Sequence, residues 1–497
     1  MTTLVHRETR PLARLAALTD QQTAIAVFVI SFLLFAACIP RITTRLDPVT
    51  GDEPFYLMTT YSIIHDHDID ETNSFAERDW LRFYPSYPLA QDWQGWPNIS
   101  PALPPHAATT FRTGLYSKHG LGIPVLIVIP FAVWGRTGVV LLYNLMAAGV
   151  AANLYLLTRS VAARRRALTI TAILMASVPL VTYAFLIFPE MPAALMIIYA
   201  VRRLLAPTNT RWQWALTGLC AGYLPWLHSR FVPVVGAIAL IFAVRHLRRA
   251  WRPALFGVVP GALLLALFEL YSFAFFHYPV PLVRPDRAGF SSTQGTINGF
   301  VGSLVDAQWG LLIVAPVYLL AIAALALYLG ANLHDGAALL VILLPYVLVI
   351  SKYRVWWGEW GPAARYLTAA LPLLALPLAW WWERAAGSHP RGAAWLLGIV
   401  SAWGFIWTAG WLRQPQWLYN QPDGHNNLLS HWLGGFGTHV AAHLPVYQFY
   451  AVSPLDTRIL WGVVVVLLGI VAGSQMMLLT LPTDDERPYE QEPSHAD

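Results

Sequence analysis

The sequence is poor in charge and nearly free of cysteine. Charged side chains make up 12% of its 497 residues, whereas a soluble globular protein has about 25%. The two cysteines, Cys38 and Cys220, both lie in apolar runs, which disfavours a disulfide framework and a cysteine-based metal site. We find no internal repeat of the kind that marks inverted-repeat transporters. A cleaved signal peptide is not indicated either, because arginines precede a long first apolar run that is typical of an uncleaved signal anchor.

Apolar residues take the place of the missing charges. They make up 56% of the chain and fall into many runs of roughly twenty residues, the length that crosses a bilayer. These runs predict an all-α polytopic membrane protein of the cell membrane, with about twelve transmembrane helices. A cytoplasmic segment at 1–20 precedes the transmembrane domain at 21–481. The acidic, proline-bearing tail at 482–497 is expected to be cytoplasmic and disordered.

Arginine clusters set the predicted orientation. The net charge of +5 comes almost wholly from arginines at the ends of apolar runs, which indicates topology rather than a nucleic-acid partner. Residues 121–135 are short for a span and are predicted to lie on the membrane surface, because counting them as a span would place later arginine clusters outside. The spans are expected at 21–39, 137–158, 167–187, 190–206, 212–228, 231–245, 253–276, 308–329, 336–351, 365–382, 393–411 and 459–481. Both termini then lie inside, with long external loops at 40–136, 277–306 and 412–457, the first of which is expected to contain interfacial helices.

Polar residues gather at the predicted outer surface. Asp52 and Glu53 follow the first span, and Pro54 suits the first turn of the next helix. Most other charges fall at cytoplasmic helix ends, so a polar group on the outer side indicates a site. The other members of this group are Glu190 and the residues expected to bind substrate, namely Lys118, His119, His228, Arg230, Lys352, Arg354, Glu359 and Arg365.

Several of these residues also have an ordinary structural interpretation. Arg230 and Arg365 could extend to lipid headgroups, and Glu190, between two prolines, could cap the next helix. His228 could be a hydrogen-bonded wall residue, and the neighbouring tryptophans could form an interfacial belt. Taken as a set, the acids and cations predict a site with a phosphate-binding half and a half that carries a base. Arginine and lysine bind phosphate, and a carboxylate beside them accepts a proton from an attacking hydroxyl.

The order of these motifs resembles the GT-C superfamily of polytopic glycosyltransferases, especially the branch containing protein O-mannosyltransferases and the lipid A aminoarabinose transferase. Asp52 and Glu53 after the first span are similar to the acidic motif of that family's first external loop. Residues 116–121 resemble its Tyr-x-Lys-Pro-Pro-Leu segment, with histidine and glycine in place of the two prolines. Glu190 stands where the family often has a second acid, normally aspartate. The run 356–366 resembles the aromatic-plus-arginine stretch of bacterial relatives without an assigned substrate.

This resemblance implies an inverting glycosyltransferase that moves a sugar from a polyprenyl-phosphate donor to an acceptor at the outer face of the membrane. Asp52 would be the general base, Glu53 would position the acceptor or the base, and Glu190 would orient one of the substrates. Cations would hold the leaving lipid phosphate and offset the charge that develops as the glycosidic bond breaks. The cations expected in that role are Lys118, Arg230, Arg354 and Arg365.

The sequence does not identify a cofactor or the acceptor. Some members of the superfamily use a divalent cation and others do not. Asp66, Asp68 and Asp70 offer hard oxygen ligands, but their spacing of two scatters them over different faces of a helix, so only a loop would bring them together. The sequence discloses neither the sugar nor whether the acceptor is a glycan, a lipid or a protein. The loop 412–457 could help to bind the acceptor, or could be a structural lid.

Two other classes of function are considered. A transporter or flippase of a lipid-linked saccharide would carry charges near the bilayer midplane and broken helices in matching halves, whereas the charges here crowd at one face. A non-catalytic lipid-binding assembly subunit would carry the acid pair as a vestige. The variant Asp52→Asn separates these classes, because an enzyme would lose transfer and keep donor binding.

Overall fold

A computed structural model describes residues 18–43, 51–83, 105, 110, 112–277, 291–359, 361–418 and 423–481. Within these ranges the chain is all-helical and has no β-strand. The all-α prediction is therefore confirmed for the described part of the chain. The tail at 482–497, most of the segment at 1–20 and parts of each predicted external loop lie outside the described residues.

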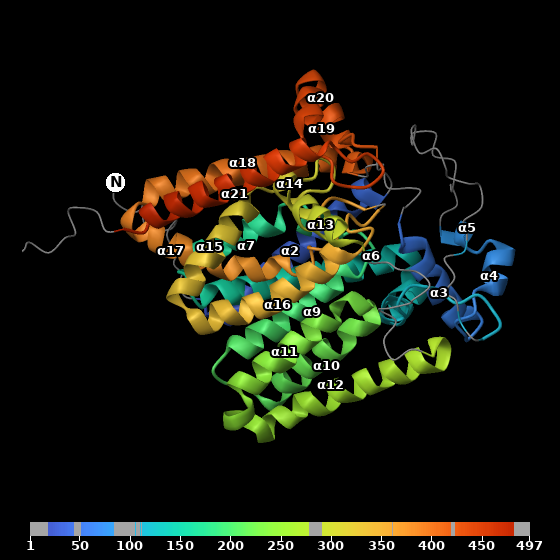
Figure 1. The fold of residues 1–497 in the computed structure, drawn as a ribbon. Helices are drawn as coiled ribbons and strands as arrows, with labels where there is room; N and C mark the ends of the chain where they lie inside the picture. Colours follow the sequence, from blue (N-terminus) through green and yellow to red (C-terminus); the bar gives the residue numbers. More distant parts are fainter. Residues whose placement is uncertain are drawn as a thin grey trace, which may run out of the picture.

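The helices follow one another along the chain as Figure 1 shows. The first half of the chain contains α2 (Asp20–Thr43), α3 (Glu53–His65), α4 (Thr72–Glu77), α5 (Trp80–Phe83), α6 (Gly122–Arg159), α7 (Arg164–Met175), α8 (Leu180–Tyr183), α9 (Glu190–Leu205), α10 (Arg211–Leu227), η1 (Ser229–Phe231) and α11 (Val232–Arg245). The second half contains α12 (Leu247–Phe276), α13 (Thr293–Val305), α14 (Leu311–Val314), α15 (Val317–Ala331), α16 (Leu333–Lys352), η2 (Leu371–Leu374), α17 (Ala375–Ser388), α18 (Pro390–Arg413), η3 (Pro415–Leu418), α19 (Asn427–Trp432), α20 (Gly434–His443) and α21 (Leu455–Leu478).

Six helices in the described residues are long and apolar enough to cross a membrane, namely α2, α6, α12, α16, α18 and α21. Several of the other predicted spans fall on short or broken helices. The predicted span 167–187 is divided before Pro179, and the span 308–329 is divided at Pro316, because proline cannot donate the hydrogen bond that continues a helix. α9 has 16 residues and is about 24 Å long, shorter than the roughly 30 Å hydrocarbon core. The count of twelve spans stays a prediction.

α6 is bent rather than straight. As one straight helix, its 38 residues would measure about 57 Å, nearly twice the hydrocarbon thickness. The backbone leaves helical geometry at Trp134 and Gly135, where Gly135 has a φ of 56° that glycine adopts without steric cost. This break separates the predicted surface segment at 121–135 from the predicted span at 137–158. Figure 1 shows the cyan first part of α6, beside α3, nearly end on, whereas the long helices run across the view.

Ion pairs gather at one end of the helix bundle. Asp20, which begins α2, contacts Arg159 at the end of α6 at 2.9 Å. Arg166 in α7 contacts Glu383 in α17 at 2.5 Å, and the end of α21 contacts His389, the residue that follows α17. We call this the arginine-rich end. The first described helix begins there and the last one ends there.

Glycines let helices approach closely near the opposite end. An added methyl group on Gly120 or Gly122 would lie within 2.5 Å of the Trp226 backbone in α10. Earlier in α10, a methyl group on Gly218 would lie 1.8 Å from the carbonyl oxygen of Gly257 in α12. Small residues permit this kind of backbone contact between helices. The segment before α6 is thereby held against the end of α10.

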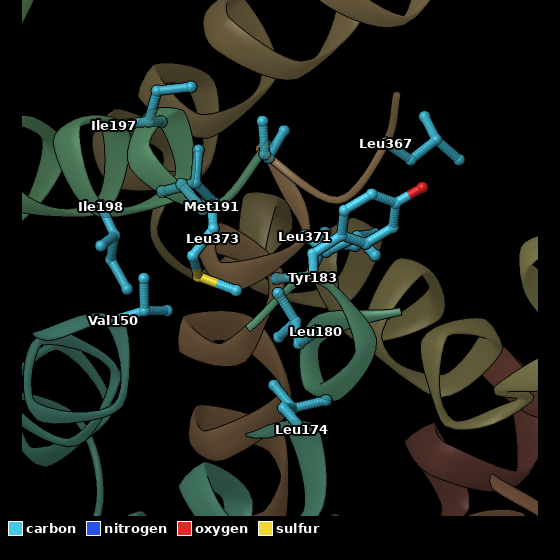
Figure 2. Close-up of a cluster of buried hydrophobic side chains, with 14 of the residues drawn as sticks. Val150, Leu174, Leu180, Tyr183, Met191, Ile197, Ile198, Leu367, Leu371 and Leu373 are labelled. Carbon is cyan, nitrogen blue, oxygen red and sulfur yellow. The ribbon is translucent and has the colours of Figure 1, made fainter. Parts of the chain in front are cut away.

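A buried apolar core connects the elements that carry the candidate site. Figure 2 shows side chains of α6, α7, α8 and α9 together with Leu367, Leu371 and Leu373, which precede α17. Val150, Leu174 and Ile198 of this cluster are fully buried. Truncating such a residue to alanine costs about 2–5 kcal/mol. The core therefore fixes the start of α9 relative to the turn before η2.

Candidate functional site

Asp52 precedes α3, but its side chain does not cap that helix. Its backbone carbonyl accepts hydrogen bonds from the N–H groups of Phe55 and Tyr56 at 3.2 and 3.3 Å, whereas its carboxylate makes no capping hydrogen bond. An aspartate at this position commonly accepts one from the first helical turn. The carboxylate is instead directed to groups outside α3, and 23% of the side chain stays exposed.

Arg365 fixes the Asp52 carboxylate. Its buried guanidinium forms an ion pair with Asp52 through Nη2. Its Nη1 donates to the Gly358 carbonyl at 2.8 Å, and its Nε donates to Glu190 Oε1 at 3.3 Å. Burial opposes ionisation of Asp52, but the charge of Arg365 outweighs this effect and holds the pKa of the carboxyl well below its usual range. Asp52 is therefore ionised at neutral pH and held in one position.

Glu190 joins Arg365 to a second buried arginine. Glu190 begins α9 and is fully buried, and its Oε1 accepts a hydrogen bond from Arg230 Nη2 at 2.7 Å. The Arg230 guanidinium lies over the ring of Tyr366 at 4.4 Å. We call Asp52, Glu190, Arg230 and Arg365 the ion cluster. Its two negative and two positive charges balance, which is the condition under which charges are tolerated away from water.

His119 covers one side of Asp52. Its Nε2 lies 3.9 Å from Asp52 Oδ1, which is too far for a hydrogen bond. The imidazole stacks on Phe55 with ring centroids 5.5 Å apart and meets Tyr56 edge to face at 5.3 Å. Burial lowers the pKa of His119 to about 4, although the charge of Asp52 acts in the other direction. The imidazole is therefore neutral at pH 7.

Glu53 connects the start of α3 to two other segments of the chain. It is fully buried, and its Oε1 accepts a hydrogen bond from Arg136 Nε at 2.5 Å. Its Oε2 accepts one from the backbone N–H of Ile187 at 3.3 Å. Arg136 directly follows the break in α6 at Gly135. Glu53 thus ties the start of α3 to the bend of α6 and to the segment before α9.

Three more of the predicted residues lie around the ion cluster. Lys118 and Glu359 are exposed, and the charge of Lys118 adds to the larger effect of Arg365 in favouring the ionised form of Asp52. His228 is partly buried, and its Nδ1 accepts a hydrogen bond from the backbone N–H of Arg230 at 3.1 Å. His228 therefore stabilises the turn after α10. Among these three, Lys118 is the cation that solvent can reach beside Asp52.

The structure does not bring Lys352 and Arg354 into the ion cluster. The Lys352 carbonyl accepts a hydrogen bond from the backbone N–H of Ser291 at 2.8 Å, and the Lys352 side chain is exposed. The Arg354 guanidinium lies 5.0 Å from the ring centre of Phe449. The predicted set of substrate-binding cations is therefore divided between two places.

Sequence reasoning missed Tyr56 and Arg136. Tyr56 is 1% exposed, and its hydroxyl has no hydrogen-bond partner among the described residues. It follows Asp52 by four residues, the spacing that places two residues on one helix face, and this spacing could have identified it. Arg136 lies between two apolar stretches on the predicted outer side, which could have identified it as a partner for a buried acid.

The described residues do not fit a divalent cation. They contain no cluster of three His, Cys, Asp or Glu side chains that could hold a metal ion. Asp68 Oδ1 accepts hydrogen bonds from Ser62 Oγ at 2.8 Å and from the Asp70 N–H at 3.0 Å. Asp70 Oδ1 accepts others from Thr72 and Leu115. These oxygens stabilise the turn after α3, so we derive no step through a metal ion.

Comparisons of the chain with protein-family models, with curated proteins and with solved structures found no match in any of the three. The function of the chain is therefore inferred from the ion cluster and from the sequence motifs that contain its residues. An ionised, partly exposed carboxylate beside an exposed lysine can accept a proton and can stand next to a bound anion.

Proposed function

We propose that the protein is an inverting glycosyltransferase of GT-C type. It takes a sugar from a polyprenyl-phosphate donor and transfers it to an acceptor hydroxyl at the extracytoplasmic face of the plasma membrane. The observation that carries this proposal is the Asp52 carboxylate, which Arg365 keeps ionised and fixed while one edge stays open to solvent. The resemblance in sequence supplies the reaction class, and the site supplies the base.

In the proposed reaction, the acceptor oxygen attacks the anomeric carbon of the donor sugar while its proton passes to Asp52. The bond from that carbon to the lipid phosphate breaks, and the polyprenyl phosphate leaves with the electron pair, so the configuration inverts. A carboxylate with a depressed pKa is a weak base. Proton transfer must therefore come late, when an oxocarbenium-like sugar has made the attacking hydroxyl more acidic.

The supporting residues have different roles from those that the sequence suggests. Arg230 and Arg365 are 6% and 4% exposed and are already paired with carboxylates, so we assign them to positioning Glu190 and Asp52. Lys118 is exposed beside Asp52. We assign it to the leaving phosphate, because a lysine offers three donors and one positive charge.

We propose that the arginine-rich end faces the cytoplasm, as the positive-inside rule requires. Glu190 begins α9, which ends beside Arg202 and Arg203, and Arg230 precedes α11, which ends at Arg245. Each of these helices thus runs from the ion cluster to a basic end. On this proposal the short helices pass between the same two surfaces as the six long ones, which gives about twelve passes in all.

The proposal is tested with purified protein in liposomes that contain a polyprenyl-phosphate sugar, using a panel of sugars. We expect Asp52→Asn to lower the transfer rate by about 10²- to 10⁴-fold, the usual contribution of a general base, and to keep donor binding. Asp456→Asn is the matched control, because Asp456 is an exposed aspartate at the start of α21. Unaltered transfer in Asp52→Asn overturns the proposed role of Asp52. Movement of saccharide across the vesicle wall without a new glycosidic bond identifies a transporter instead.

A further inference from the structure

A second site lies outside the ion cluster, at a cavity of about 430 Å³. We call it the Arg354 cavity. Its walls come from the start of α13, from the residues that follow α16, and from the segment before α21 that contains Tyr447 and Phe449. Its volume falls within the roughly 300–1,000 Å³ of ligand pockets.

The walls of the Arg354 cavity are fastened to one another. Asp306, which follows α13, accepts a hydrogen bond from the backbone N–H of Tyr447 at 2.7 Å, and the next backbone N–H, of Ala307, donates to the Pro445 carbonyl at 2.8 Å. Ser291 donates to the Lys352 carbonyl from both its backbone N–H and its hydroxyl. The cavity is therefore formed before any ligand arrives.

The described walls of the cavity carry a positive charge. Arg354 is exposed, and no carboxylate among the described residues lies within ion-pair distance of it. None of the described residues that line the cavity is acidic. The Arg354 guanidinium instead lies over the ring of Phe449 at 5.0 Å. Its planar group is thus held at the cavity and can bind a carboxylate or a phosphate with two parallel hydrogen bonds.

Neutral donors line the wall that α13 provides. Asn298 Oδ1 accepts hydrogen bonds from Arg458 Nη1 at 2.7 Å and from Gln294 Nε2 at 3.1 Å. Because an arginine can only donate, these bonds fix the orientation of the Asn298 amide and leave its NH₂ group for another acceptor. Ser291 and Ser292 line the same side; the Ser291 hydroxyl already donates to the Lys352 carbonyl, so it can only accept a hydrogen bond from a ligand. Together these groups suit a ligand that carries many hydroxyls.

Aromatic rings supply the remaining surface. Trp356 and Tyr447 are buried and pack in one apolar cluster behind the cavity, while Phe449 is 42% exposed. An exposed ring next to fixed polar donors can contact the apolar C–H face of a sugar, and burial of that face contributes about 25 cal/mol per Å². A cation, fixed amide and hydroxyl groups and an exposed aromatic ring therefore converge on one cavity.

We propose that the Arg354 cavity binds an acidic saccharide, whose carboxylate pairs with Arg354 and whose ring packs on Phe449. One residue, Trp357, separates Trp356 of this cavity from Gly358, whose carbonyl accepts a hydrogen bond from Arg365 in the ion cluster. The saccharide is therefore assigned as part of the acceptor in the proposed transfer reaction. This assignment depends on the proposed function, whereas binding to the cavity does not.

The test uses the full chain in detergent and measures the dissociation constant of digalacturonate by isothermal titration calorimetry. Digalacturonate dimethyl ester, which has the same sugar without the charge, is the matched ligand. We expect Arg354→Gln to weaken digalacturonate binding by at least about tenfold and to leave the ester unaffected. Phe449→Ala should weaken both ligands. Arg384→Gln is the matched control, because Arg384 is also exposed and lies over an aromatic ring, that of Trp380, away from the cavity.

Binding of digalacturonate that does not change in Arg354→Gln overturns the proposal, and so does an absence of binding. Binding of geranyl phosphate but not of digalacturonate, with dependence on Arg354, also overturns it and assigns the cavity to the lipid phosphate. Asp52→Asn should bind digalacturonate as the unaltered protein does. Failure of sugar transfer with intact, Arg354-dependent binding would therefore refute the proposed enzyme and leave the saccharide site standing.

Discussion

Replacing Arg365 with glutamine tests whether the ion cluster behaves as one balanced unit. The substitution removes a positive charge and the groups that bind Asp52, Glu190 and the Gly358 carbonyl. Because Glu190 is fully buried, the cluster is left with an uncompensated negative charge. Breaking a buried ion pair costs about 3–5 kcal/mol. We expect Arg365→Gln to lower the free energy of unfolding by about that amount.

Adding Glu190→Gln to Arg365→Gln should recover part of this loss. The double variant keeps one negative and one positive charge, on Asp52 and Arg230, so the net charge of the cluster returns to zero. Glu190→Gln alone is also destabilising, because it leaves Arg230 without its carboxylate partner. Coupling between contacting residues is about 0.5–3 kcal/mol. The double variant should therefore lose at least about 1 kcal/mol less than the sum of the two single losses.

The assay is thermal unfolding of the four proteins in one detergent, followed by tryptophan fluorescence. The control is Arg384→Gln, in which an exposed arginine near the arginine-rich end is replaced, and a surface change of this kind should stay within about 0.5 kcal/mol. If the loss of the double variant equals the sum of the two single losses, the four residues do not act as one balanced unit. An Arg365→Gln protein that is as stable as Arg384→Gln leads to the same conclusion.

Three further predictions concern Glu71, Arg136 and Gly358. Burial raises the pKa of Glu71 from 4.5 to about 7, so the contribution of the protonated Glu71 to stability is complete below pH 4.5 and is lost as the pH rises to about 7. The Glu71→Gln protein should lack this pH dependence and should be more stable than the unaltered protein at pH 8 by about 3 kcal/mol. Unfolding midpoints measured from pH 4.5 to pH 8 will test this. Arg136→Gln removes the Nε donor of buried Glu53 and should lower the free energy of unfolding by about 3 kcal/mol or more. A loss below about 1 kcal/mol in fluorescence-detected unfolding would contradict this prediction. Gly358→Ala places a methyl group 2.7 Å from Arg365 Cδ, at a residue whose φ is 86°. Arg365 must then shift, so the transfer rate should fall by roughly tenfold or more. An unchanged transfer rate would show that the contact is relieved without moving Arg365.

The position of the acid pair and the bend of α6 can be predicted from the sequence. Asp52 lies just after a long apolar run, and arginine clusters separate the segment at 121–135 from the span at 137–158. Both features are local in the chain and follow from run length and charge. The lengths of the helices are harder to predict, because Pro179 and Pro316 interrupt helices within runs that remain apolar on both sides of the proline.

Pairing within the site cannot be predicted in the same way. Arg365 and Asp52 are 313 positions apart, and which of several outward cations meets which acid depends on how the helices pack. Arg354 lies two residues before the aromatic run that contains Arg365, yet it lines the Arg354 cavity and not the ion cluster. The burial of Glu53 is likewise decided by the bend of α6, where Arg136 meets it.

The most direct measurement is a structure of the Asp52→Asn variant in a lipid nanodisc with farnesyl phosphate, in which the density of the phosphate is located. We predict that the phosphate lies within hydrogen-bond distance of the Lys118 side chain, next to position 52. Phosphate density confined to the arginine-rich end, or to the middle of the helix bundle, would contradict the account.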